Sequence, residues 1–331
     1  MSDPLGLSIG TTNLVAARVG NQPVIRRSVL TLFGHAAPEV GMSSAHTNGI
    51  VLSGFVERVG DPVPLVAADG SPHQADQLLV DALQAMVYTT DGQPSPETAI
   101  AVPAYWGTST LWALRNALRA NPTLAPNGMP VRLISDAVAS LTALHVNPGL
   151  SPHGVVALLD FGGGGTSITL ADAASAFEPI EDTTRYAEFS GDLIDQALLN
   201  HVLEGIATAG GLDPAATAAV GSLTRLREEC RNAKERLSAE TVTELIVELP
   251  GYRSGIRVTR TELESLIAQP LAGVLAALET ALERNRISWS NISAMVTAGG
   301  GASIPLITQR LSEHSRAPMV SGNLDPALAT I

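Results

Sequence analysis

The sequence predicts an α/β fold made of two duplicated lobes around a cleft, and three observations lead to this prediction. Residues 5–19, LGLSIGTTNLVAARV, are typical of a β-hairpin, because an apolar run, a break containing Gly and Asn, and a second apolar run follow one another. Residues 154–171, GVVALLDFGGGGTSITLA, repeat that plan. After each hairpin, strand-like and helical patterns alternate, which indicates an internal duplication. We therefore expect lobe I at residues 1–150 and lobe II at 151–331, with a helical subdomain at about 192–290 and a ligand cleft between the lobes.

The individual elements follow from hydrophobic periodicity and from turn-forming residues. Apolar and β-branched runs predict further strands at 24–33, 51–59, 98–102, 131–135, 183–189, 242–249, 256–258 and 292–297. Helical periodicity predicts helices at 74–88, 108–120, 137–145, 192–208 and 222–237, helices spanning 260–284, and one more after the stretch AGGGASIP. Residues 34–50 and 60–73 are rich in Gly and Pro, so we expect surface loops there.

Charge and composition argue against several classes of protein. The net charge of −12 disfavours a nucleic acid as the main partner, since phosphate backbones bind basic faces. The sequence lacks a long uncharged apolar stretch and a basic flank before an apolar core, so we expect no membrane span and no signal peptide, and a cytoplasmic location. The single cysteine, Cys230, excludes an intramolecular disulfide and is typical of a small helix residue. His35, His46 and His73 lack metal-ligand spacing.

Three glycine-rich turns follow strand-like runs, and such turns are suited to binding phosphate. Asp160 is followed by Gly162–Gly165, whose consecutive backbone N–H groups have no side chains to keep an anion away. Gly10, Thr11 and Thr12 offer the same backbone chemistry with two hydroxyl donors. Gly299–Gly301 precede a predicted helix, whose N-terminus favours negative charge. The set predicts a grip on nucleotide phosphates; the alternative is that tight hairpins simply need glycine.

These motifs also carry a family resemblance. SIGTTN, LLDFGGGGTSITL and TAGGGASIP resemble the phosphate and adenosine signatures of the actin-like ATPase superfamily, specifically the nucleotide-binding domain of 70-kilodalton heat-shock chaperones. AVPAYW, LISDAVASLTAL, LREECRNAKERLS and NLDPALA are similar to further segments of that branch, and the likeness is weakest between residues 33 and 94. The resemblance implies an actin-like ATPase fold, ATP or ADP as ligand, and a chaperone's role in the stress response.

The resemblance implies a set of ligand-binding residues, transferred position by position. They are Gly10, Thr11, Thr12 and Asn13 in the first loop, Gly162, Gly163 and Gly164 in the second with either Gly165 or Thr166 next, Gly191 in the following motif, Arg231, Lys234, Glu235 and Ser238 on the adenosine helix, Gly299, Gly300, Gly301 and Ser303 in the third loop, and Asp325 near the ribose and base. Arg231 and Glu235 stand where the family has Glu and Arg, an exchange that keeps a local ion pair possible while changing contacts to the base.

The family's catalytic groups are depleted in this sequence. Ser8 stands where the family has an aspartate that helps to place hydrated Mg²⁺, and Ser167 replaces a second carboxylate. Lys234 is the only lysine, so the lysine that positions the attacking water has no counterpart. Asp160, Asp136 and Thr166 are the residual catalytic candidates, with Mg²⁺ bound through water near Asp160 at most. Losing one preorganised group typically lowers the rate about a hundredfold to a thousandfold, so we expect hydrolysis near background.

Three functions remain open on these grounds. The first is a chaperone's nucleotide-binding domain that binds ATP or ADP weakly and switches conformation with little turnover. The second is an interaction scaffold that has kept the fold and lost nucleotide binding. The third, least favoured, is an actin-like sugar or acetate kinase, for which Asp136 or Asp192 would be the catalytic aspartate. The resemblance further implies a peptide-binding domain after NLDPALATI and co-chaperone-like partners, so we expect this chain to be a fragment of a longer protein.

Three single residues allow structural predictions. Trp106 and Trp112 flank the start of a predicted helix, and we expect a core or lobe-interface role for both. Asp195 repeats the spacing of a family acidic motif, and an exposed acid near a helix start explains it equally well.

Overall fold

A computed structural model describes residues 3–41, 49–90, 95, 97–126, 130–147, 149–208 and 220–321. Among the described residues, the chain divides into two compact units. Unit 1 comprises the chain up to Leu158 together with Thr169–Thr184. Unit 2 comprises Leu159–Ile168 and Arg185–Ser321, and so contains the glycine-rich turn at residues 162–165.

The first predicted hairpin lies at the centre of a five-stranded sheet in unit 1. The sheet has the order β10-β9-β1-β2-β3 and consists of β1 (Leu5–Ile9), β2 (Asn13–Arg18), β3 (Val24–Arg27), β9 (Thr98–Val102) and β10 (Arg132–Ser135). The strands β1 and β2 are antiparallel, with Ile9 opposite Leu14, whereas β1, β9 and β10 run parallel. This combination is typical of a hairpin followed by crossover helices.

Further strands and helices complete the N-terminal part of unit 1. It contains a three-stranded sheet, β5 (Glu39–Val40), β4 (Val29–Leu32) and β6 (Ile50–Ser53), the pair β7 (Leu65–Val66) and β8 (Pro72–His73), the short helix η1 (Val56–Arg58), and the helices α1 (Ala75–Thr90), α2 (Thr108–Arg119) and α3 (Asp136–Val146). Helix α1 packs against β2 and α2 and contributes Leu79, Leu83 and Met86 to a fully buried core. Trp106 belongs to that core, but Trp112 on α2 is 67% exposed, so the prediction of a core role is wrong for Trp112.

The second predicted hairpin is the centre of a second sheet with the same plan. Its strands are β11 (Val155–Phe161), β12 (Thr166–Asp172), β13 (Glu178–Pro179), β14 (Thr184–Tyr186), β17 (Ile292–Ala298) and β18 (Met319–Ser321). The order β13-β12-β11-β17-β18 repeats β3-β2-β1-β9-β10, and β14 pairs with β12 in addition. In both sheets the last two strands are parallel to each other. The repeated strand order confirms the duplication predicted from the sequence.

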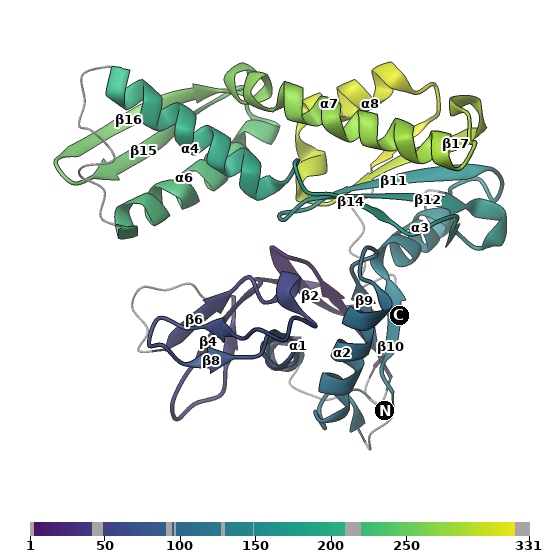
Figure 1. The fold of residues 1–331 in the computed structure, drawn as a ribbon, viewed down its shortest axis with the longest axis horizontal. Coiled ribbons are helices and arrows are strands. Elements are labelled where there is room, and N and C mark those ends of the chain that lie inside the picture. Colours follow the sequence, from purple (N-terminus) through teal and green to yellow (C-terminus); the bar gives the residue numbers. More distant parts are fainter. Residues whose placement is uncertain are drawn as a thin grey trace. The chain divides into compact units, whose positions relative to one another are not determined.

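The helical part of unit 2 is built around a β-hairpin, as Figure 1 shows. The hairpin consists of β15 (Val242–Leu249) and β16 (Tyr252–Thr259). Helix α6 (Val220–Ala239) packs against β15 and also against α4 (Gly191–Thr208). Along β15 every second residue is buried, because α6 covers one face of the hairpin only. The remaining elements of the unit and its sheet are α7 (Arg260–Arg284), α8 (Pro305–His314) and the short helices η3 (Ala173–Ser175), η4 (Trp289–Asn291) and η5 (Gly300–Ser303).

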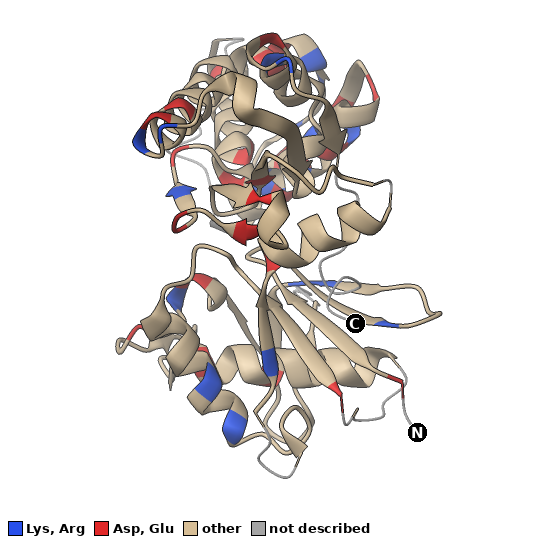
Figure 2. Cartoon of the chain, turned by 90° about the vertical axis from the view of Figure 1, so that its right-hand side faces the viewer, with Lys and Arg blue, Asp and Glu red and all other residues tan. Residues whose placement is uncertain are grey.

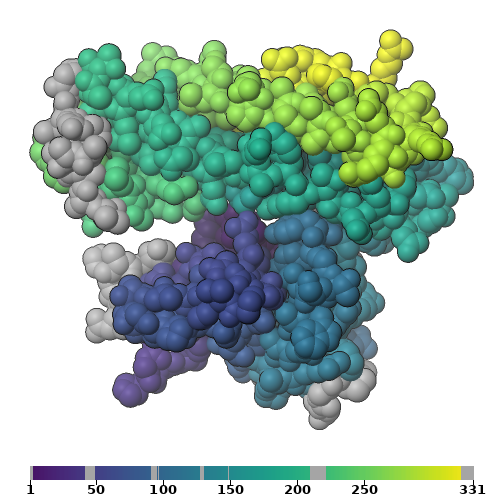
Figure 3. Space-filling view, viewed as in Figure 1, coloured from purple at the N-terminus to yellow at the C-terminus, as the bar shows by residue number. Residues whose placement is uncertain are grey.

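Helix α7 is a single helix that continues through Pro270, where separate helices were expected. Among the described residues it is the one helix long and apolar enough to cross a membrane by length and composition, and 39% of its most apolar window is buried. Its buried side chains, which include Leu263, Ile267, Leu271 and Val274, recur every three or four residues. This spacing is typical of a core helix, and a core helix can also be long and apolar enough to cross a membrane. Other residues of α7 lie on the surface of unit 2 in Figure 3.

Several strand predictions were too long. The run at 24–33 divides into β3 and β4 at Ser28, whose N–H donates to the carbonyl of Thr12 in the first glycine turn. The run at 51–59 ends at Ser53 and is followed by η1, and the run at 183–189 forms a strand only over Thr184–Tyr186. At Ser28 a hydrogen bond to a neighbouring segment, which periodicity does not report, accompanies the boundary.

Candidate functional site

The first and second glycine turns have the same backbone geometry. In the second turn, which joins β11 to β12, the Gly162 N–H donates to the carbonyl of Gly165 over 3.0 Å. In the first turn, which joins β1 to β2, the Gly10 N–H donates to the carbonyl of Asn13, also over 3.0 Å. Both are therefore four-residue turns, and Gly165 completes the second one.

This geometry corrects the assignment of Thr166. The residue is the first of β12, its side chain is fully buried, and its hydroxyl donates to the carbonyl of Phe189 over 2.9 Å. A hydroxyl turned into the core and bonded there is not presented to a ligand, so Thr166 is removed from both the binding and the catalytic set. Gly165 takes the turn position that the sequence left open between the two residues.

Helix α4 fixes which way the second turn faces. The N–H groups of Gly191 and Asp192 donate to the carbonyls of Gly162 and Gly163, each over 3.0 Å. In a trans peptide the C=O and N–H groups point in opposite directions, so the N–H groups of Gly163 and Gly164 face away from α4. The approach is close, because a Cβ at Gly191 would lie 3.3 Å from Gly163 Cα. The N–H groups of Gly163 and Gly164 thus lie on the side of the turn opposite α4.

The third glycine-rich loop packs against the end of β11. Gly299 has a φ of +80°, and a Cβ there would lie 2.6 Å from the carbonyl oxygen of Phe161 and would meet the Asp160 carboxylate. A Cβ at Gly301 would lie 2.9 Å from Phe161 Cβ, whereas Gly300 has open space around it. Gly299 and Gly300 are exposed. Loop 299–303 and Asp160 are therefore neighbours within unit 2.

Asp160 lies partly buried between the second turn and this loop. Burial raises the pKa of its carboxyl, and the positive charge of Arg185 opposes that rise. Arg185 was not predicted as a site residue. It follows TT in the stretch EDTTRYAEF, which carries no recognisable motif, and only the pairing of β14 with β12 brings it to the turn.

A buried ion-pair network joins α6 to the start of α4. Asp195 on α4 is fully buried and lies 2.7 Å from Lys234 Nζ and 3.2 Å from Arg231 Nε, both on α6. Lys234 also donates to the Gly191 carbonyl over 3.1 Å, and Arg231 further contacts Asp192 and Glu228. The interpretation of Asp195 as an exposed acid is therefore wrong, because the residue anchors the two helices that flank the second turn.

Burial and charge on α6 also affect its cysteine. Cys230 is fully buried, and burial together with the negative charge of Asp195 raises the pKa of its thiol to about 12. Cys230 fits the predicted role of a small helix residue.

Basic and acidic residues are interspersed along the described elements, as Figure 2 shows.

One predicted residue of α6, Ser238, lies beside the third loop. Arg231, Glu235 and Ser238 are four and three residues apart and so share one helix face. The Ser303 hydroxyl lies 3.4 Å from the Ser238 hydroxyl and donates to the carbonyl of Gly300 over 2.7 Å. Ser303 and Ser238, which are far apart in the sequence, are thus brought together.

The remaining candidates belong to unit 1 or lie outside the described residues. In the first turn, the Ser28 hydroxyl donates to the carbonyl of Gly10 over 2.7 Å, and Arg27 donates to Asn13 Oδ1 over 3.4 Å. Asp136 begins α3 and accepts a hydrogen bond of 2.9 Å from the N–H of Ala104. Asp325 lies outside the described residues.

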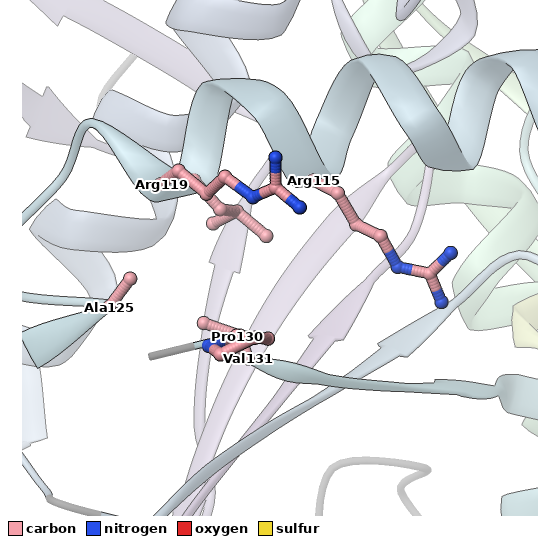
Figure 4. A pocket seen from close by; sticks show the side chains of 6 residues that line it. Arg115, Arg119, Ala125, Pro130 and Val131 are labelled. Carbon is pink, nitrogen blue, oxygen red and sulfur yellow. The ribbon is translucent and has the colours of Figure 1, made fainter. Parts of the chain in front are cut away.

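Among the residues that the structure describes, no metal cluster is present and the pocket beside α2 is small. The described residues contain no cluster of three or more His, Cys, Asp or Glu that could hold a metal ion. A small hollow of about 20 Å³ lies beside α2 and is lined by Arg115, Leu118, Arg119, Ala125, Pro130 and Val131 (Figure 4). It has room for about one water molecule and involves none of the glycine turns.

The repeated five-strand order, with a glycine turn in each central hairpin, defines a protein of the actin-like ATPase class. The model of the Hsp70 protein family matches residues 55–330. The chain therefore belongs to the Hsp70 family, which confirms the resemblance seen in the sequence.

Individual relatives are distant but cover most of the chain. The chain is 26% identical to the chaperone protein DnaK of Cenarchaeum symbiosum (strain A), over 98% of this chain and 52% of that protein. It is also 26% identical to the chaperone protein DnaK of Nitrosopumilus maritimus (strain SCM1), over 98% of this chain and 54% of that protein. The heat shock cognate HSP70 protein of Trypanosoma brucei brucei is 26% identical over 82% of this chain and 39% of its own length. The chain thus spans about half the length of the DnaK relatives that it matches.

Proposed function

We propose that the chain is a nucleotide-binding domain of an Hsp70-type molecular chaperone, which binds ADP or ATP and hydrolyses ATP slowly or not at all. The observation that supports this proposal is the convergence, within unit 2, of three segments that are distant in sequence. They are the turn at 162–165, the loop at 299–303 and the face of α6 that carries Ser238.

The glycine cradle fits a phosphate chain. The N–H groups of Gly163 and Gly164 face one way, and Gly299 and Gly300 are exposed beside them at the end of β11. In this proposal, Gly162–Gly165, Gly191 and Gly299–Gly301 bind the phosphates. Arg231, Lys234, Glu235, Ser238 and Ser303 then line the adenosine end of the site.

Further parts of the proposal rest on the family alone. Gly10, Thr11, Thr12 and Asn13 form the first phosphate loop, Asp136 and Asp160 are residual catalytic groups, and Asp325 lies near the ribose. Lobe I covers residues 1–150 and lobe II residues 151–331, with a helical subdomain at about 192–290. A substrate-binding domain, co-chaperone-like partners, a cytoplasmic location and a role in the stress response complete the proposed function.

Slow hydrolysis follows from the chemistry of the residues present. Ser8 is a buried strand hydroxyl, and Ser167 lies in β12, where the family resemblance implies carboxylates. Lys234, the only lysine, is bound to Asp195 and to the Gly191 carbonyl. A lysine bound in this way does not position an attacking water, and hydroxyls do not balance the charge of Mg²⁺.

Isothermal titration with ADP and with ATP tests the proposal, with Gly163→Val as the variant. Gly163 belongs to the turn that the proposal assigns to phosphate, and its carbonyl accepts a hydrogen bond from the N–H of Asp192, so we expect a valine there to lower the affinity about tenfold or more. Gly205→Val is the matched control, because Gly205 lies on the same unit in open space on α4.

The outcomes separate the candidate functions. Binding that is lost in Gly163→Val and kept in Gly205→Val supports a nucleotide domain. Failure of the folded chain to bind either nucleotide would favour the interaction scaffold instead. Multiple-turnover ATP hydrolysis at an ordinary enzymatic rate would disprove slow hydrolysis, and phosphate transfer to a sugar or to acetate would identify a kinase.

A further inference from the structure

Arg185 is directed at the second glycine turn by the strand that carries it. Strand β14 pairs with β12, and successive side chains of a strand point to opposite faces. The Tyr186 ring lies against Gly273 of α7, where a Cβ would lie 3.0 Å from Tyr186 Cζ. Arg185 therefore points to the other face, where Nη1 donates to the Ser167 hydroxyl over 3.1 Å.

The turn is shaped to accept this guanidinium. A Cβ at Gly165 would lie 2.7 Å from Arg185 Nε and 2.8 Å from its Cζ. Any other residue at position 165 would displace the arginine, so the fourth glycine makes room for a cation as well as closing the turn. The cation thus lies against the backbone that the proposed function assigns to phosphate.

The oxygen atoms around the turn are better suited to pair with a guanidinium than to coordinate a magnesium ion. Mg²⁺ is bound in proteins through carboxylates and water. Of the carboxylates near this turn, Asp160 interacts with the charge of Arg185 and Asp192 pairs with Arg231. The Ser167 hydroxyl accepts a hydrogen bond from Arg185. Within the described ranges no group of three or more His, Cys, Asp or Glu could supply a metal site.

We propose that Arg185 provides the positive charge that binds the nucleotide phosphates at the second turn, so that this chain binds ADP and ATP without a divalent cation. The inference rests on the proposed nucleotide-binding function and assigns its charge balance to a residue of the chain. An arginine has a planar fork of N–H donors that matches phosphate oxygens, and its charge is permanent.

Calorimetric titration of ADP and ATP, in EDTA and in Mg²⁺, tests the inference. We expect the unmodified chain to bind with affinities that agree within about threefold in the two conditions. Arg185→Ala should bind about 10- to 100-fold more weakly in EDTA, the range expected for a lost charge-assisted contact. Arg185→Lys should lie in between, because it keeps the charge and loses the fork. Arg253→Ala is the matched control, since Arg253 is 79% exposed on the β15–β16 hairpin.

A second variant separates the position of the guanidinium from its presence. Gly165→Ala keeps Arg185 but pushes it from the turn, so it should also weaken binding in EDTA, with thermal unfolding confirming that the variant is folded. Nucleotide binding by the unmodified chain that requires Mg²⁺, or undiminished binding by Arg185→Ala, overturns the role of Arg185 and leaves the proposed function standing. Absence of binding in both conditions overturns both.

Discussion

The two hairpin turns of this protein are closed by the same main-chain hydrogen bond, but different groups contact them. Each is a four-residue turn closed by a 3.0 Å hydrogen bond between its first N–H and its last C=O. The first, Gly10–Asn13, is supported by a serine hydroxyl and a long hydrogen bond from Arg27. The second, Gly162–Gly165, contacts the N-terminus of α4 and the guanidinium of Arg185.

The comparison shows that the two copies have kept the hydrogen bond that closes the turn and differ in the charged side chains near it. A glycine turn places N–H groups but carries no net charge, so the side chains behind it decide what it binds. In unit 2, the charged groups Asp160, Arg185, Asp192 and Asp195 lie on segments that contact the second turn or the start of α4.

The largest expected difference between the two turns concerns what stabilises them. Asp195→Ala removes the buried carboxylate that pairs with Lys234 and Arg231, and we expect the free energy of unfolding to fall by about 3–5 kcal/mol. Asn13→Ala at the first turn removes only a 3.4 Å contact, so about 0.5 kcal/mol is expected. Denaturant unfolding measures both.

Glu248→Ala is the control for the loss of Asp195. Its ion pair with Arg253 spans 3.1 Å, with side chains 53% and 79% exposed, so a change of about 0–1 kcal/mol is expected. If Asp195→Ala and Glu248→Ala changed stability equally, the buried network would not be what supports the second turn.

The next largest effect is expected at the third loop, residues 299–303, which packs against the end of β11 beside the second turn. Gly299→Ala places a side chain at a φ of +80° and 2.6 Å from the Phe161 carbonyl oxygen, so we expect a loss of about 2–3 kcal/mol and weaker ADP binding. Gly300→Ala, with nothing within 4 Å, should change stability by less than about 0.5 kcal/mol. Thermal unfolding with and without ADP distinguishes the two, and equal effects would argue against the packing of this loop on β11.

A smaller difference separates the turns themselves. A Cβ at Gly10 would lie 2.8 Å from the Asn13 carbonyl oxygen, and one at Gly162 would lie 3.2 Å from that of Gly165. We expect Gly10→Ala to lower the free energy of unfolding by about 1–2 kcal/mol and Gly162→Ala by less than about 1 kcal/mol. The reverse order in denaturant unfolding would show that the second turn is the more tightly closed.

The smallest expected effect tests the correction at Thr166. Thr166→Val removes the buried hydrogen bond to the Phe189 carbonyl, which should lower the free energy of unfolding by about 1 kcal/mol without changing ADP affinity. Ser28→Ala, which removes the equivalent support from the Gly10 carbonyl, provides the comparison at the first turn. A selective loss of ADP binding in Thr166→Val would return Thr166 to the binding site.

The fold could be predicted where local signals agreed with tertiary structure. Thr98–Val102 is a strand with the expected bounds, and both hairpins are present, because alternating apolar residues and glycine turns act over short range. Helix α7 differs from the prediction because packing along its buried face outweighs the hydrogen bond lost at Pro270. The exposure of Trp112 depends on which face of α2 meets the core, which the sequence around a single aromatic residue does not define.

The candidate site could be predicted in its backbone but not in its charges. Glycines mark their own positions in a sequence, so all three loops were found. Arg185 and Asp195 act through contacts with residues at least eighteen positions away in the chain, from Ser167 to Lys234, and no spacing rule links them. The family motif is one glycine shorter than this turn, so the sequence leaves Gly165 and Thr166 as alternatives for one position. The hydrogen bond that closes the turn at Gly165 depends on the three-dimensional structure.

The buried thiol of Cys230 can report local opening of this protein without an added label site. Thiol reagents attack the thiolate, and a thiol with a pKa of about 12 has almost none at neutral pH. Because the chain has one cysteine, every labelling event reports a moment when the packing around α6 has opened. The rate of thiol labelling therefore measures how often the helical part of unit 2 opens. Mass spectrometry can follow this rate in the unmodified chain, with and without a ligand that changes the opening.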